Sequence, residues 1–210
     1  ALSPLEVATA YATFANGGFK IEPNLIRTID SINEEFYYQE MPLELCVKDC
    51  EGKVKKATRV VEPRVAFIMN SMLSDAVKKG TARKATRILG RQDLHGKTGT
   101  TNDSDIWFSG YTPNLVATAW AGFSDNSPLG NREWGSTVPL ETWIEFMKEA
   151  LKGSPEDILR SKPEGLVLVK IDPKTGLRAK ASDPQGIFEI FREEYSPQTI
   201  SKRVPGFEVE

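Results

Sequence analysis

The sequence predicts an α+β fold in which helices pack on an antiparallel sheet, followed by a small β extension. Two observations carry this prediction: three amphipathic segments with helix-boundary residues, and three apolar segments in close order that read as strands. The 210 residues suffice for one sizeable domain with an appendage. A net charge of −2 without a long basic stripe argues against a nucleic-acid partner, and no apolar run approaches 18 residues, so no membrane segment is expected.

Three helices are predicted from capping signals and apolar spacing. Ser3-Pro4-Leu5-Glu6 is a capping box with proline at the first helical position, so a helix is expected to run from there to about Ala15. The second helix is expected from Pro63 to Gly80, and the third from Pro139 to Gly153. Their predicted buried positions are Leu5, Ala8, Tyr11 and Phe14; Val65, Ile68, Met69, Met72, Leu73 and Val77; and Trp143, Phe146, Met147, Ala150 and Leu151.

The sheet is predicted from segments 94–100, 106–111 and 115–123, with Thr112-Pro113-Asn114 joining the last two as a hairpin. Trp107 and Trp120 are interpreted as cross-strand packing residues. Residues 21–32 are apolar enough for one strand or two short ones, 33–60 read as an irregular excursion, and 81–90 as a basic connection.

The composition changes after Gly153, so residues 154–210 are expected to form a separate extension. Residues 166–171 read as a strand with 177–181 as its hairpin partner, and 182–210 as an extended or partly disordered arm. Cys46 and Cys50 leave two alternatives, a short disulfide or two reduced thiols. No metal site is expected, because two thiols and one distant histidine fall short of four ligands.

The segment His95-Gly96-Lys97-Thr98-Gly99-Thr100-Thr101 is the strongest candidate site. In an extended strand, Lys97 and Gly99 face one way and Thr98 and Thr100 the other. Gly99 has no Cβ, so another backbone or a substrate can lie close to the strand. Lys97 offers charge, Thr98 a hydroxyl, and the main chain amides, so the segment predicts a sheet edge that binds a carboxylate-bearing, peptide-like ligand.

Two other segments imitate known motifs. Lys174-Thr175-Gly176 repeats the K-T-G letters but follows Asp172-Pro173 between apolar runs, which predicts a hairpin turn. Gly90 and Gly96-Lys97-Thr98 approach a phosphate-binding loop, but five residues separate the glycines where the motif has four. No nucleotide or other cofactor is therefore expected.

The context of the K-T-G segment resembles class A penicillin-binding proteins of the 1a group. The resemblance rests on 2–6 with 10–18, on Gly80-Thr81-Ala82 with 96–103, on Trp107-Phe108-Ser109-Gly110-Tyr111-Thr112-Pro113, and on 171–176. It implies a β-lactamase/DD-peptidase-like fold, with residues 1–153 as the C-terminal portion of a transpeptidase domain. The parent would act at the periplasmic side of the bacterial inner membrane, be membrane-anchored, and carry a glycosyltransferase domain. There the cysteines would form a disulfide.

The resemblance also implies a chemistry, in which a serine attacks the D-alanyl-D-alanine end of a peptidoglycan stem peptide. Lys97 and Thr98 would hold the carboxylate of the peptide or of a β-lactam, Gly99 would give clearance, and the Thr100 N–H would complete the oxyanion hole. Thr101 would line the same substrate site.

The expected serine and second motif are missing. Ser71 and Ser74 lack a lysine three residues later, and Ser124-Asp125-Asn126 follows the K-T-G segment, so it reads as a loop. The chain is expected to hold one wall of the site, to need the N-terminal half of the domain as partner, and to be inactive alone. The alternatives are a non-catalytic binding or scaffold module of the same fold, and, fitting less well, a piece of a β-lactamase or carboxypeptidase.

Overall fold

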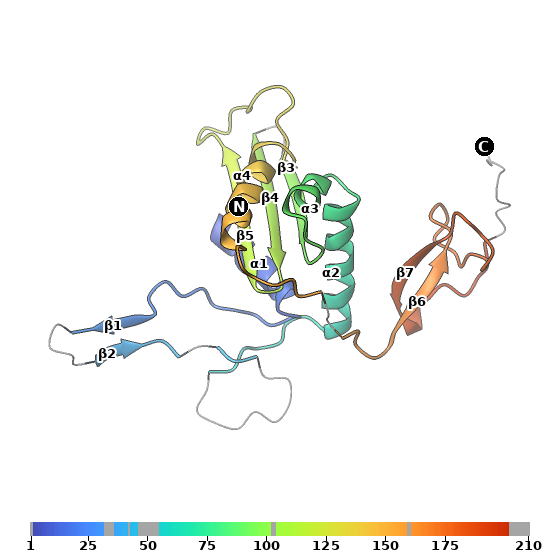
Figure 1. Cartoon of the computed structure of the whole chain (residues 1–210), viewed down its shortest axis with the longest axis horizontal. Coiled ribbons are helices and arrows are strands. Elements are labelled where there is room, and N and C mark those ends of the chain that lie inside the picture. Colours follow the sequence, from blue (N-terminus) through green and yellow to red (C-terminus); the bar gives the residue numbers. More distant parts are fainter. Residues whose placement is uncertain are drawn as a thin grey trace. The chain divides into compact units, whose positions relative to one another are not determined.

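The computed structural model describes residues 2–31, 36–41, 43–45, 55–101, 104–158 and 161–201. The chain forms two compact units, Ala1–Arg160 with two sheets and Ser161–Glu210 with one (Figure 1). The larger unit carries the helices and the candidate site.

The main sheet of the first unit has three antiparallel strands in the order β3-β4-β5. They are β3 (His95–Thr101), β4 (Asp105–Thr112) and β5 (Leu115–Gly122), which confirms the three predicted strands and their hairpin. Trp107 and Trp120 are register partners with ring centroids 5.9 Å apart, so their predicted cross-strand contact is confirmed.

Helices cover both faces of this sheet. Alternate β4 residues point to opposite faces: Phe108 packs edge-on against Trp143 of α4 (Val138–Ala150), whereas Tyr111 packs against Tyr11 of α1 (Pro4–Ala15). α2 (Pro63–Lys78) packs beside β3 (Figure 1). The main core lies on the α4 face and contains Val77, Ala82, Ala85, Leu94, Phe108, Leu140, Trp143, Ile144 and Met147.

The helix boundaries follow the predicted signals. The Ser3 hydroxyl accepts from the Glu6 N–H, and the Glu6 carboxylate accepts from the Ser3 N–H at 2.7 Å, so the capping box is confirmed. The buried faces differ from prediction at five positions that are exposed: Leu5, Val65, Met72, Phe146 and Ala150. Helical spacing identifies an apolar face but not whether another element covers all of it.

Two connecting regions also differ from prediction. Residues 83–89, expected as a basic connection, form helix α3 (Arg83–Leu89), whose Ala85 is fully buried. Of the predicted strand region 21–32, the structure describes residues 21–31, and among these only the short strand β1 (Thr28–Asp30) is extended in a sheet. It pairs with β2 (Phe36–Gln39) inside the expected excursion. Cys46 and Cys50 lie outside the described residues.

The second unit is a two-stranded sheet of β6 (Leu166–Ile171) and β7 (Ile187–Arg192), followed by a 3-10 turn (Glu193–Tyr195). The prediction of 177–181 as the hairpin partner of β6 is confirmed only near the start of that segment. Arg178 forms an antiparallel bridge to Ile171, and the Ala179 N–H donates to the Lys170 carbonyl oxygen at 2.9 Å. The strand that pairs along the whole of β6 is β7, from the segment expected as an arm. Residues 202–210 lie outside the described part of the chain.

Candidate active site

Strand β3 is at one end of the sheet order, and within the described ranges no strand pairs with its outer edge. An unpaired edge presents backbone N–H and C=O groups that can bind an extended peptide. Lys97, Thr100 and Thr101 are exposed along this strand, while Thr98 and Gly99 are half-buried. The structure therefore brings all five predicted site residues together on one accessible strand.

The Lys97 ammonium lies at the surface beside the neighbouring backbone. Its Nζ donates a hydrogen bond to the Thr98 carbonyl oxygen at 2.9 Å. This bond holds the cation along the strand rather than away from it. The positive charge of Lys97 therefore lies beside the Thr98 backbone, although the two side chains leave the strand on opposite faces.

The loop before α4 lies directly on the backbone of β3 and β4 at Gly99. The Gly135 N–H donates to the Thr100 hydroxyl at 3.2 Å. A Cβ placed on Gly135 would lie 2.3 Å from the Trp107 carbonyl oxygen and 2.6 Å from that of Gly99. Only glycine fits this contact, so Gly135 is a neighbour of the candidate site that the sequence analysis did not identify.

A hydroxyl pair connects the site to the turn after α2. The Thr81 and Thr98 hydroxyl oxygens are 2.9 Å apart. Sequence analysis placed Thr81 in the resembling segment 80–82 but assigned it no role. Its proximity to Thr98 could not be seen from spacing, because 17 residues separate the two threonines.

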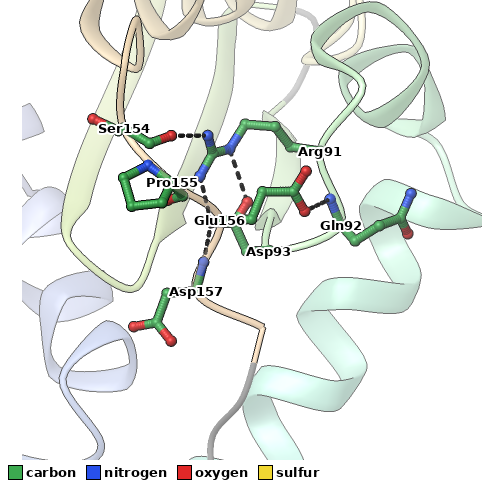
Figure 2. Close-up of polar contacts among 7 residues, drawn as sticks. All are labelled: Arg91, Gln92, Asp93, Ser154, Pro155, Glu156 and Asp157. Carbon is green, nitrogen blue, oxygen red and sulfur yellow. Dashed lines mark hydrogen bonds and ion pairs between the residues drawn. The ribbon is translucent and has the colours of Figure 1, made fainter.

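A buried ion pair fixes the chain just before β3 (Figure 2). The Arg91 guanidinium donates to both carboxylate oxygens of Asp93, at 2.9 and 2.6 Å, and to the carbonyl oxygens of Ser154 and Pro155. The Asp157 N–H also donates to Asp93. We call these contacts the Arg91–Asp93 clasp. They tie residues 154–157 to the first unit, although the composition changes after Gly153.

The clasp also sets the charge state of Asp93. Burial raises the pKa of the Asp93 carboxyl, but the hydrogen bonds from Arg91 and the Asp157 N–H, with the guanidinium charge, outweigh it and leave this pKa below its ordinary value. The hydrogen bond to Asp93 raises the pKa of Arg91 further above neutrality. Both groups are therefore charged at neutral pH.

Other polar contacts support the far end of β3 and β4. His95 stacks on Tyr111 with ring centroids 5.0 Å apart, and the Tyr111 hydroxyl donates to Asn70 Oδ1 of α2 at 2.5 Å. The Asn70 amide donates in turn to the Phe14 carbonyl oxygen of α1. Helices α1 and α2 are thus joined to the strand that pairs with β3.

The second K-T-G segment and the Ser124-Asp125-Asn126 segment lie in turns or loops, as predicted. Asp172 accepts from the Lys174 N–H at 3.0 Å and from the Thr175 hydroxyl at 3.1 Å, so the second K-T-G is turn structure. Ser124 and Asp125 lie in a turn after β5. Within the described residues there is no cluster of histidine, cysteine or acidic side chains that could hold a metal ion. No helix in those residues is long and apolar enough to cross a membrane.

Comparison with known proteins gives concordant matches. The family described as penicillin binding protein transpeptidase domain matches residues 1–129. Penicillin-binding protein 1A of Pseudomonas aeruginosa is 37% identical over 98% of this chain, and that of Neisseria gonorrhoeae is 35% identical over 88%. The chain spans only 29% and 25% of the length of these relatives.

A solved structure is similar throughout. The crystal structure of penicillin-binding protein 1A from Haemophilus influenzae matches with a TM-score of 0.85 and 34% identity, covering 95% of this chain and 33% of that one. The predicted α+β architecture and its penicillin-binding fold are confirmed by this similarity.

Proposed function

Because the chain belongs to the penicillin binding protein transpeptidase family, we propose that it forms part of a peptidoglycan D,D-transpeptidase that cross-links stem peptides and binds β-lactams. The reaction is serine acyl transfer, and this chain supplies one wall of its site. The observation that carries the proposal is the β3 edge, which no described strand pairs with and on which Lys97, Thr98 and Gly99 follow one another.

Each site residue has a role that its position supports. Lys97 and Thr98 bind the carboxylate of the stem peptide or β-lactam by charge and by hydrogen bonding. Gly99 leaves room for the ligand beside the strand. The backbone N–H of Thr100 donates to the oxyanion of the tetrahedral intermediate, and Thr101 lines the same groove. The Gly135 N–H, which donates to the Thr100 hydroxyl, supports this part of the strand.

The nucleophile is proposed to come from another part of the parent protein. No serine of the 210 residues is followed three positions later by lysine. The side chains of this chain can position a carboxylate but have no activated hydroxyl with which to form an acyl adduct. We therefore expect the chain to be inactive alone, and to act with the N-terminal half of its domain.

A second face of the first unit supports this partner. The outer edge of β5 pairs with no strand in the described part of the chain. Beside it lies an apolar groove between α1 and α4, lined in part by the exposed side chains of Leu5, Trp120, Val138 and Phe146. Such a patch is typical of a contact surface. The rest of the domain is proposed to extend the sheet here and cover the groove.

The remaining properties of the parent follow the family. We propose a membrane-anchored protein that acts at the periplasmic side of the bacterial inner membrane and carries a glycosyltransferase domain. Its substrates are stem peptides ending in D-alanyl-D-alanine, and its inhibitors are β-lactams.

The proposal is tested by labelling the full-length parent with a fluorescent penicillin and mapping the modified peptide by mass spectrometry. One adduct is expected, on a serine outside residues 1–210. An adduct on Ser71, Ser74 or Ser124 would contradict the proposal that the nucleophile lies outside this chain. No adduct at all would favour the scaffold alternative.

A further inference from the structure

The hydroxyl pair of Thr81 and Thr98 joins the carboxylate-binding strand to the turn between α2 and α3. The two oxygens are 2.9 Å apart, and either hydroxyl can donate. Within the described part of the chain, neither hydroxyl makes a second hydrogen bond. The pair therefore has one hydrogen bond, and a ligand can set which of the two hydroxyls donates it.

The turn holds Thr81 in place through its two neighbours. Before it, the Gly80 N–H donates to the Asp75 carbonyl oxygen at 3.0 Å, and a Cβ on Gly80 would lie 2.7 Å from the Ala76 carbonyl oxygen. After it, Ala82 is fully buried in the main core, and its N–H donates to Ala76. The backbone of Thr81 is thus fixed on both sides relative to the end of α2.

The chemistry of a hydroxyl makes the direction of this bond important. A hydroxyl carries one proton and can accept two hydrogen bonds. If Thr98 donates to Thr81, its proton is used and cannot reach a ligand carboxylate. If Thr81 donates to Thr98, the Thr98 proton remains for the carboxylate, and each bond polarises the next.

We propose that Thr81 is a positioning residue. Its hydroxyl donates a hydrogen bond to the Thr98 hydroxyl, which leaves the Thr98 O–H free to donate to the carboxylate of the bound ligand. This inference rests on the proposed function, in which Thr98 binds that carboxylate. Thr81 acts through Thr98 and does not touch the ligand. Its effect is limited to ligands that present a carboxylate at this position.

The test measures second-order acylation rates of the full-length enzyme with a penicillin and with the methyl ester of the same penicillin. Thr81→Val keeps the shape but removes the hydroxyl, so it should slow acylation by the free acid about twofold to tenfold, the range of one neutral hydrogen bond. The rate with the ester should stay unchanged. Thr81→Ser, which keeps the hydroxyl, should restore the rate with the acid.

Thr98→Val provides the background that separates the two proposals. It should slow acylation by the free acid, and Thr81→Val should then add nothing, because its target hydroxyl is gone. Three results would each overturn the role of Thr81 while leaving the carboxylate assignment intact. Thr81→Val could slow acylation by the acid and the ester equally, or slow neither. It could also slow acylation by the acid as much in the Thr98→Val background as in the wild type. A Thr98→Val enzyme with an unchanged rate would overturn the carboxylate assignment as well.

Discussion

Replacing Arg91 with alanine should destabilise the first unit strongly, because it leaves the Asp93 carboxylate buried without its partner. The Asp93 side chain is only 1% exposed and that of Arg91 12% exposed. Alanine removes two hydrogen bonds to the carboxylate and two to the carbonyl oxygens of Ser154 and Pro155 (Figure 2). Breaking a buried pair by removing one partner typically costs about 3–5 kcal/mol.

The assay is urea unfolding of the 210-residue chain, followed by tryptophan fluorescence at pH 7. Lys84→Ala is the matched control, since it removes a cation from an ion pair with Glu141 whose side chains are 38% and 59% exposed. Exposed pairs contribute roughly 0–1 kcal/mol. Arg91→Ala should therefore lower the free energy of unfolding several times more than Lys84→Ala.

A second substitution checks the physical cause. Asp93→Asn removes the buried charge while keeping the size of the side chain. Added to Arg91→Ala, it should recover part of the lost stability, because the uncompensated charge is gone. The reasoning would be refuted if Arg91→Ala and Lys84→Ala lowered the free energy of unfolding equally. It would also be refuted if Asp93→Asn lowered it as much in the Arg91→Ala background as in the wild type.

Three further predictions follow from the structure. The pKa of Asp93 is lowered on folding, so its contribution to stability is present above the ordinary aspartate pKa of about 3.9 and is lost as pH falls through the folded pKa. Below pH 4, the free energy of unfolding in urea should therefore fall more for the wild type than for Asp93→Asn. Trp143→Ala should cost about 3–5 kcal/mol in the same assay, since Trp143 is 1% exposed, and a loss below 1 kcal/mol would contradict its place in the core. Cys46 and Cys50 should resist alkylation until reduced, and rapid labelling of unreduced protein isolated from the periplasm would show two thiols instead.

Local signals in the sequence were sufficient for the elements that hold the site. The capping box at Ser3 predicts a helix from neighbouring residues, and the structure has that helix. Strands were predicted in the same local way at 94–100, 106–111 and 115–123, and the structure has strands there. The K-T-G segment could be placed on a strand for the same reason. The turn at Asp172 was equally local, because its own carboxylate accepts the bonds that close it.

Contacts between distant segments could not be predicted in the same way. The pairing of β6 with β7 skips residues 177–181, which a pattern of alternating residues cannot reveal. Helix α3 has only 7 residues, too few for apolar periodicity to distinguish it from a polar connection. The contacts of Thr81, Gly135 and the Arg91–Asp93 clasp join segments that are far apart in the sequence, so only the fold shows them.

The central claim is that the β3 edge binds the ligand carboxylate, and its most direct test compares the lysines of the two K-T-G segments. In the full-length enzyme, Lys97→Ala should slow acylation by a penicillin at least about tenfold, because a charge-assisted hydrogen bond contributes about 1.5–3 kcal/mol. Lys174→Ala should leave the rate unchanged, because Lys174 is an exposed turn residue. Equal effects of the two substitutions would contradict the assignment of the β3 edge as the carboxylate-binding site.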